Sequence, residues 1–212
     1  MDAAFWHERW ESKEIGFHEG RVNRLLEAHL NVLGLEPGAR IFMPLCGKAF
    51  DIQWLHGQGF HVLGAELSEI AIRELFDEMG LAPDVTDEGG LLRYRAERID
   101  IFVGDVFELG ADLLGPVEAV YDRAAVVALP AGIRGRYAAH VAAITGCAPQ
   151  LVITFDYDQT AMEGPPFSVP PAAVEELYAR AYSVIELARA EVAGKLKGQV
   201  EAMEIIWLMR TA

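Results

Sequence analysis

The stretch SVIELARAEVAGKLKGQVEAMEIIWLMR, residues 183–210, carries two apolar runs near the end of the chain, at 183–188 and 202–210. The segment between them, 189–201, is too short to hold a crossover helix comfortably. A hairpin is the simpler interpretation. We therefore expect the last strand of the chain to run antiparallel to its neighbour.

Upstream of this hairpin, apolar runs alternate with segments that predict helices. Strands are expected at 40–45, 60–67, 91–94, 99–103, 117–121 and 150–157, and helices at 50–57, 69–79, 131–145 and 171–181. Ser68 and Gly80 are suited to begin and end the second of these helices. Strands joined by crossover helices form parallel sheets. The sequence predicts an α/β fold: a mostly parallel sheet with an antiparallel strand near its end and helices on both faces.

The organisation of the chain is expected to be a single domain over 1–212. Its first part, 1–37, reads as an N-terminal helical lid region, with one helix ending near Trp10 and another at about 22–32. The pair Pro37-Gly38 ends this region, and 38–212 form the α/β core. The runs 91–94 and 99–103 are candidates for a hairpin-like pair.

The charge of the chain is strongly acidic, with 32 Asp and Glu against 18 Lys and Arg, or −14 net. Nucleic-acid binding needs clustered basic residues, so we expect no nucleic-acid partner. There is no signal-peptide pattern and no apolar run long enough to span a bilayer, which predicts a cytoplasmic protein without a membrane partner. The two cysteines lack metal-binding spacing, so no metal is expected. We expect a monomer acting on a small molecule.

The first strand ends in MPLCGK, residues 43–48. Its single glycine makes neither GxGxxG nor a P-loop, so the turn suits a cofactor without phosphates. A plain strand-to-helix turn is the alternative. Cys46 has no histidine nearby in sequence and is expected to be a packing residue rather than a nucleophile.

Acids follow the next two strands, at the edge where open α/β sheets bind ligands. Glu66 is placed to accept hydrogen bonds from both hydroxyls of a ribose, the alternative being a capping or solvated acid. Asp105 is a candidate for the exocyclic amine of an adenine, with the Val106 amide beside the ring; the alternative is an Asp turn. Arg123 is expected at the cofactor's carboxylate end or over the substrate, paired with Asp122, another acid or a ligand.

Ordered motifs cover nearly the whole chain. They are FWHERW (5–10), GFH (16–18), VN (22–23), MPLCGK (43–48) with Asp51 and WL (54–55), GAELS (64–68), YDRAA (121–125), FDYDQ (155–159) and GPPFSV (164–169). In these motifs the chain resembles the thiopurine S-methyltransferase family in its bacterial form. One departure is Asp156, where many relatives would show Glu.

The resemblance implies a Rossmann-like class I methyltransferase with a seven-stranded sheet, which uses S-adenosyl-L-methionine. It places cofactor contacts on Trp10, Leu45, Glu66 and Arg123, and it places Phe17 against the substrate. Taken by their spacing alone, Trp6 and Trp10 would lie on one helix face as core residues.

The mechanism expected from this resemblance is in-line methyl transfer to the thiolate of a small aromatic or heterocyclic thiol. Most of the rate effect would come from orientation, and Arg123 is the catalytic and substrate-binding candidate because it can stabilise an anionic acceptor. Three alternatives stay open: methylation of tellurite or selenite, a nicotinamide-dependent oxidoreductase, and a binding protein without activity. The loop at 165–167 is either a wall of the acceptor pocket or a rigid connector.

Overall fold

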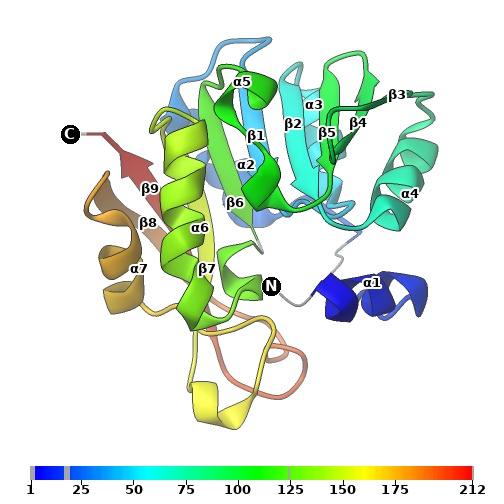
Figure 1. The fold of residues 1–212 in the computed structure, drawn as a ribbon. Helices are drawn as coiled ribbons and strands as arrows, with labels where there is room; N and C mark the ends of the chain where they lie inside the picture. The colour runs from blue at the N-terminus through cyan, green and yellow to red at the C-terminus, as the bar shows by residue number, and fades with distance from the viewer. Residues whose placement is uncertain (1–2, 17–19, 124, 212) are drawn as a thin grey trace. The chain divides into compact units, whose positions relative to one another are not determined.

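The computed structural model describes residues 3–16, 20–123 and 125–211, and the chain divides into two compact units. Residues 2–118 form the first unit, and residues 119–212 form most of the second. Each unit is described by itself below (Figure 1). The expectation of a single domain with a lid over residues 1–37 stays a prediction.

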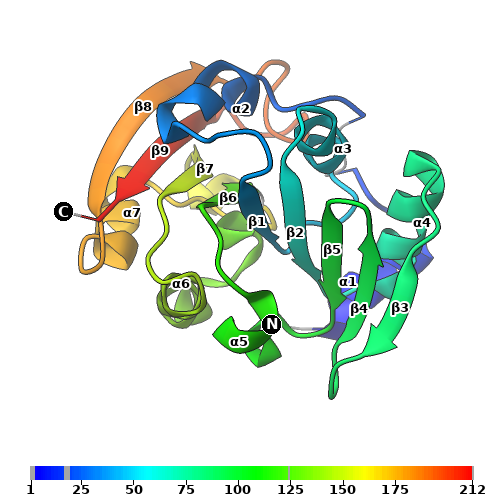
Figure 2. The ribbon, with the colours of Figure 1, turned by 90° about the horizontal axis from the view of Figure 1, so that it is seen from above.

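The first unit contains five strands. They are β1 (Arg40–Pro44), β2 (His61–Glu66), β3 (Asp84–Asp87), β4 (Leu92–Ala96) and β5 (Ile99–Val103). Their order is β3-β4-β5-β2-β1; β1 and β2 run parallel, as do β2 and β5, whereas β4 is antiparallel to both β3 and β5 (Figure 2). The carboxyl ends of β1, β2 and β5 therefore meet at one edge, where Pro44, Glu66 and Val103 are the last strand residues.

Helices join these strands. They are α1 (Ala3–Glu11), α2 (Arg24–His29), η1 (Leu30–Leu33), α3 (Phe50–Gly57), α4 (Glu69–Met79), η2 (Val106–Glu108) and α5 (Ala111–Leu114). The α3 helix packs against β2, and α4 packs against β2 and β5. Ser68 begins α4 by accepting a hydrogen bond from the Ala71 amide, and Gly80 ends it in the left-handed conformation, as predicted.

The second unit contains the C-terminal hairpin. Its elements are β6 (Ala119–Arg123), η3 (Val126–Ala128), α6 (Ala131–Ile144), β7 (Gln150–Asp156), η4 (Gln159–Ala161), α7 (Pro171–Tyr178), β8 (Ser183–Glu191) and β9 (Met203–Arg210). The strand order is β6-β7-β9-β8. The β6 and β7 strands are parallel, and β9 is antiparallel to both β7 and β8. The predicted antiparallel terminal hairpin is confirmed.

The described residues form five strands in the first unit and four in the second, two more in all than the seven expected. The β4–β5 pair is antiparallel, which confirms the hairpin-like interpretation of that region. The β3 strand was not predicted because Asp84–Asp87 is exposed throughout and shows no apolar alternation. The central strands with parallel partners agree with the predicted α/β class. None of the described helices has both the length and the apolar character needed to cross a bilayer.

Candidate cofactor site

Glu66 lies at the carboxyl end of β2, and its side chain is held by two backbone amides. The Gly47 amide donates to Oε2 at 2.8 Å, and the Ser68 amide donates to Oε1 at 2.9 Å. Both donors are neutral, and a carboxylate oxygen can accept more than one hydrogen bond. The carboxylate is therefore fixed in orientation while each oxygen keeps capacity for a ligand hydroxyl.

The charge of Glu66 is costly in this position, because the residue is only 7% exposed. Burial raises the pKa of Glu66, and the hydrogen bonds from Ser68, Gly47 and Leu67 offset only part of that effect. A ligand that donates further hydrogen bonds would stabilise the ionised form. The site is thus built to receive donors such as sugar hydroxyls, and it would repel phosphate.

The loop after β1 brings the Gly47 amide to Glu66. Leu45 and Gly47 both have positive φ, 49° and 52°, a conformation that costs a leucine more than a glycine. The Cys46 amide donates to Ala65 O at 3.0 Å, which ties the loop to β2. These two conformations turn successive backbone amides toward the edge of the sheet.

Trp10 packs on this loop from α1. A Cβ built on Gly47 would lie 3.2 Å from Trp10 Cζ2, so the indole ring lies directly against the glycine backbone. Trp10 is 3% exposed. The absence of a side chain at Gly47 therefore allows both the turn and the close approach of the ring.

Two further features of the loop support its shape. The Lys48 ammonium group forms ion pairs with Glu74 Oε2 at 2.8 Å and Glu78 Oε1 at 2.6 Å, which tie the loop to α4. Cys46 is buried, and burial raises the pKa of its thiol well above the ordinary value. This agrees with a packing role, since a reactive cysteine needs a lowered pKa.

Asp105 and Val106 follow β5, next to Glu66. The Gly104 amide donates to Glu66 O at 2.8 Å, which brings the end of β5 alongside the end of β2. Asp105 is exposed, and its Oδ1 accepts a hydrogen bond from the Phe107 amide at 3.0 Å, so the Asp turn considered above is present. One carboxylate oxygen of Asp105 remains for a ligand, and Val106 is buried beside it.

Arg123 belongs to the second unit, where it is the last residue of β6 and pairs in register with Ile153. The preceding Asp122 is buried; its Oδ2 accepts from the Tyr137 hydroxyl at 2.6 Å and its Oδ1 from the Val126 amide at 3.2 Å. Burial raises the pKa of Asp122 to about 6. Phe17, the predicted substrate contact, lies outside the described residues.

Five of the predicted residues thus lie near one another in the first unit, because they or their neighbours in sequence contact Glu66 or the loop after β1. They are Trp10, Leu45, Glu66, Asp105 and Val106. The sequence did not predict the roles of the Gly47 and Ser68 amides, because residue type does not reveal the direction of a backbone N–H group. It also left Asp51 without a role. Asp51 is buried and accepts a hydrogen bond from the Asn23 amide at 2.7 Å, so it fixes the start of α2.

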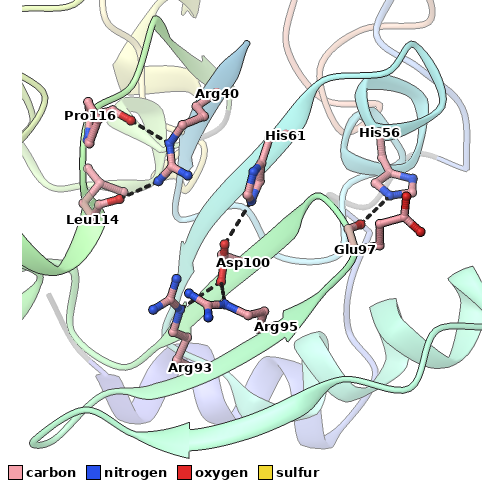
Figure 3. Close-up of polar contacts among 9 residues, drawn as sticks. All are labelled: Arg40, His56, His61, Arg93, Arg95, Glu97, Asp100, Leu114 and Pro116. Atoms are coloured by element: carbon pink, nitrogen blue, oxygen red, sulfur yellow. Dashed lines mark hydrogen bonds and ion pairs between the residues drawn. The ribbon is translucent and has the colours of Figure 1, made fainter. Parts of the chain in front are cut away.

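Asp100 in β5 is a second buried carboxylate of the first unit, and it contacts two arginines and a histidine (Figure 3). Its Oδ1 accepts from Nε of Arg93 and of Arg95, both at 2.8 Å, and its Oδ2 lies 2.9 Å from His61 Nε2. Burial raises the pKa of Asp100, but these partners outweigh it and hold the pKa below its ordinary value. Asp100 is committed to these partners and differs in this from Glu66.

Comparisons with known proteins identify the family of the chain. The family model for thiopurine S-methyltransferase matches residues 1–209. A thiopurine S-methyltransferase of Xanthobacter autotrophicus is 54% identical over 213 residues, covering 100% of each chain. One of Gluconobacter oxydans is 49% identical, covering 97% of this chain and 94% of the relative.

Solved structures share the fold at low identity. The 1,6-didemethyltoxoflavin-N1-methyltransferase of Burkholderia thailandensis has a TM-score of 0.67 at 16% identity, covering 98% of this chain and 87% of that one. Magnesium protoporphyrin IX methyltransferase of Synechocystis has a TM-score of 0.64 at 13% identity, covering 100% of each chain. The fold is that of class I methyltransferases, and the chain belongs to the thiopurine S-methyltransferase family.

Proposed function

We propose that this methyltransferase transfers a methyl group from S-adenosylmethionine to the thiolate of a small aromatic or heterocyclic thiol. The cofactor is S-adenosylmethionine, which supplies a methyl group on an electrophilic sulfonium. The observation that carries the proposal is Glu66, held by the amides of Gly47 and Ser68 at the edge of the sheet. The names of the relatives, thiopurine S-methyltransferases, support a sulfur acceptor.

The residues of the first unit fit a phosphate-free nucleoside. The free acceptor capacity of Glu66 suits the two ribose hydroxyls. Asp105 keeps one carboxylate oxygen for the exocyclic amine of adenine, and the buried Val106 lies beside it. Trp10 and Leu45 complete the proposed cofactor contacts, since one packs on the loop after β1 and the other belongs to it.

The acceptor needs little chemical activation in this proposal. A heterocyclic thiol ionises more readily than a simple thiol, so its thiolate is a nucleophile without a strong general base. We assign to Arg123 the stabilisation of that anion, and to the surrounding residues its alignment with the methyl group. Well-oriented intramolecular reactions gain about 7–11 kcal/mol from such positioning. The net charge of −14 supports a small acceptor and disfavours a nucleic acid.

Transfer of labelled methyl groups from S-adenosylmethionine tests the proposal with a panel of heterocyclic thiols, tellurite and selenite as acceptors. We expect thiols to be methylated. Labelling of the oxyanions alone would move the acceptor class to metalloids, and labelling of none would contradict enzymatic activity toward this panel. A thermal shift with S-adenosylhomocysteine but not with NAD is expected, and the reverse would favour an oxidoreductase.

The variant Arg123→Ala tests the assignment of the anion-binding group. Loss of a charged hydrogen bond to the thiolate is expected to lower kcat/KM for thiols by about 10–100-fold, while affinity for S-adenosylhomocysteine changes less. Arg136→Ala in α6 is the matched control, because Arg136 is exposed. Unchanged kinetics of Arg123→Ala at neutral pH would remove this residue from the mechanism.

A further inference from the structure

The second unit contains a cavity to whose lining residues the proposed methyl transfer assigns no role. Its volume is about 550 Å³, within the range of small-molecule sites. The start of α6, the end of β7 and the loop leading to α7 form its walls. Apolar parts of the lining include Pro130, Pro170 and Phe167, and Arg134 is its one cation.

Among the described residues, the guanidinium of Arg134 has only uncharged hydrogen-bond acceptors. It is 7% exposed; its Nε donates to Leu129 O at 2.8 Å, and its Nη1 donates to Ser168 O at 3.1 Å. Both acceptors are uncharged carbonyl groups. No carboxylate of the described residues forms an ion pair with Arg134, and its Nη2 donates to none of them. Two carbonyls fix the group in place and leave its charge uncompensated.

Burial lowers the pKa of Arg134, which shows that the site disfavours the charged form, although an arginine stays protonated. The Phe167 ring lies 5.6 Å from the guanidinium carbon and stacks against the group. An anion on the Nη2 side would receive hydrogen bonds from a planar, pre-oriented donor.

The wall that carries Phe167 is rigid. The Phe167 amide donates to Val127 O at 2.6 Å, the Ser168 amide donates to Gln159 Oε1 at 2.8 Å, and the Tyr157 hydroxyl donates to Pro166 O at 2.6 Å. These bonds hold both sides of the loop at 164–170. The cavity is therefore preformed, and binding would not need to order this loop.

Two acids limit what can bind. Asp156 and Glu163 also line the cavity, and their carboxylates form no hydrogen bond or ion pair with a described residue. A ligand with several negative charges would be repelled by them, whereas a single carboxylate can pair with Arg134. We propose that this cavity binds a small monocarboxylate whose apolar body packs against Phe167 and the prolines.

Titration of the ¹⁵N-labelled full chain with phenylacetate tests the proposal by NMR, with phenylacetamide as the neutral ligand of the same shape. We expect phenylacetate to bind about tenfold more tightly, with the largest shifts at the amides of Phe167 and Ser168. Equal affinity of the two ligands, or shifts outside the cavity, would overturn the proposal. The readout is binding, so it stays valid whether or not the chain methylates thiols.

Variants of Arg134 identify the group responsible. Arg134→Gln is expected to abolish the preference for phenylacetate, and Arg134→Lys to retain part of it, because the charge remains and the planar donor is lost. Arg136→Gln, an exposed arginine on the same helix, is expected to bind like the parent chain. If circular dichroism shows Arg134→Gln unfolded, Arg134→Lys decides: affinity equal to the parent chain would contradict the role of the guanidinium.

Discussion

Glu66 and Asp100 are buried carboxylates of the same unit with opposite surroundings. Glu66, at the carboxyl end of β2, is held by two neutral amides, and its pKa is raised. Asp100, near the start of β5, is held by two arginines and a histidine, and its pKa is lowered (Figure 3). Burial alone therefore does not distinguish the carboxylate proposed to bind the cofactor from the structural one. The partners do, because neutral amides orient a charge without neutralising it.

Replacing a carboxylate by its amide is expected to have the largest effect on stability at Asp100. An amide at this position would keep an oxygen acceptor but lose the negative charge, so Arg93, which is 17% exposed, would lose its anion. For Asp100→Asn we expect the free energy of unfolding at pH 7 to fall by about 2–4 kcal/mol, less than for a fully buried pair because Arg95 is half exposed. Urea denaturation measures this. A change below about 0.5 kcal/mol would show that the cluster is only a solvated surface network.

The same substitution at Glu66 is expected to affect binding as well as stability. Glutamine has one oxygen, so either the Gly47 or the Ser68 amide would face an NH₂ group. We expect a loss of about 1–3 kcal/mol of stability and a fall of about 10–100-fold in affinity for S-adenosylhomocysteine, measured by calorimetry on folded protein. Asp100→Asn is the control, since its affinity should stay within about twofold. Unchanged affinity of Glu66→Gln would contradict ribose binding by this carboxylate.

Asp122 in the second unit is a third buried carboxylate, and its surroundings can accommodate an amide in its place. An asparagine oxygen can accept from the Val126 amide while its NH₂ donates to the Tyr137 hydroxyl oxygen, and the proton of that hydroxyl then loses Asp122 as its acceptor. Asp122→Asn therefore removes a buried charge, and the new NH₂ group need not face the Val126 amide. We therefore expect its stability at pH 7.5 to equal or exceed that of the parent chain, by up to about 2 kcal/mol.

The pH dependence of this effect has a definite sign. The pKa of Asp122 is about 6 in the folded chain, against 3.8 for an ordinary aspartate. The folded state therefore holds the proton more tightly, and this contribution to stability is lost as pH rises from about 4 through about 6. Between about pH 4 and pH 6, the free energy of unfolding from denaturant titrations should fall more steeply with pH for the parent chain than for Asp122→Asn. Parallel curves would show that Asp122 titrates normally.

The parts of the fold that follow from chain length and apolar pattern were predictable. The short connection after residue 188 predicted the β8–β9 hairpin, and Ser68 and Gly80 predicted the ends of α4. The β3 strand was not predictable, because its four exposed residues, three of them polar, pair with β4 through backbone bonds that any side chain allows. A short exposed strand without a run of apolar residues thus escapes prediction from sequence.

The candidate site was predictable in its side chains and not in its backbone. The position of Glu66 after the second strand singled it out, and the structure brings the loop after β1 to it. The donors that hold it depend on the positive φ of Leu45 and Gly47, and residue 45 is not a type that indicates such a conformation. The lining of the Arg134 cavity also comes from residues separated along the chain, from 130 to 170, so no local motif indicates it.

The indole of Trp10 against the Gly47 backbone gives the protein an intrinsic optical probe. Indole emission depends on the polarity and rigidity of what surrounds the ring, and here the ring contacts the turn whose amide holds Glu66. Trp207, whose Nε1 donates to Thr154 Oγ1 in the second unit, offers an internal reference within the same spectrum. Binding of the proposed nucleoside at the turn is therefore expected to change the tryptophan emission of the chain, without attaching a dye.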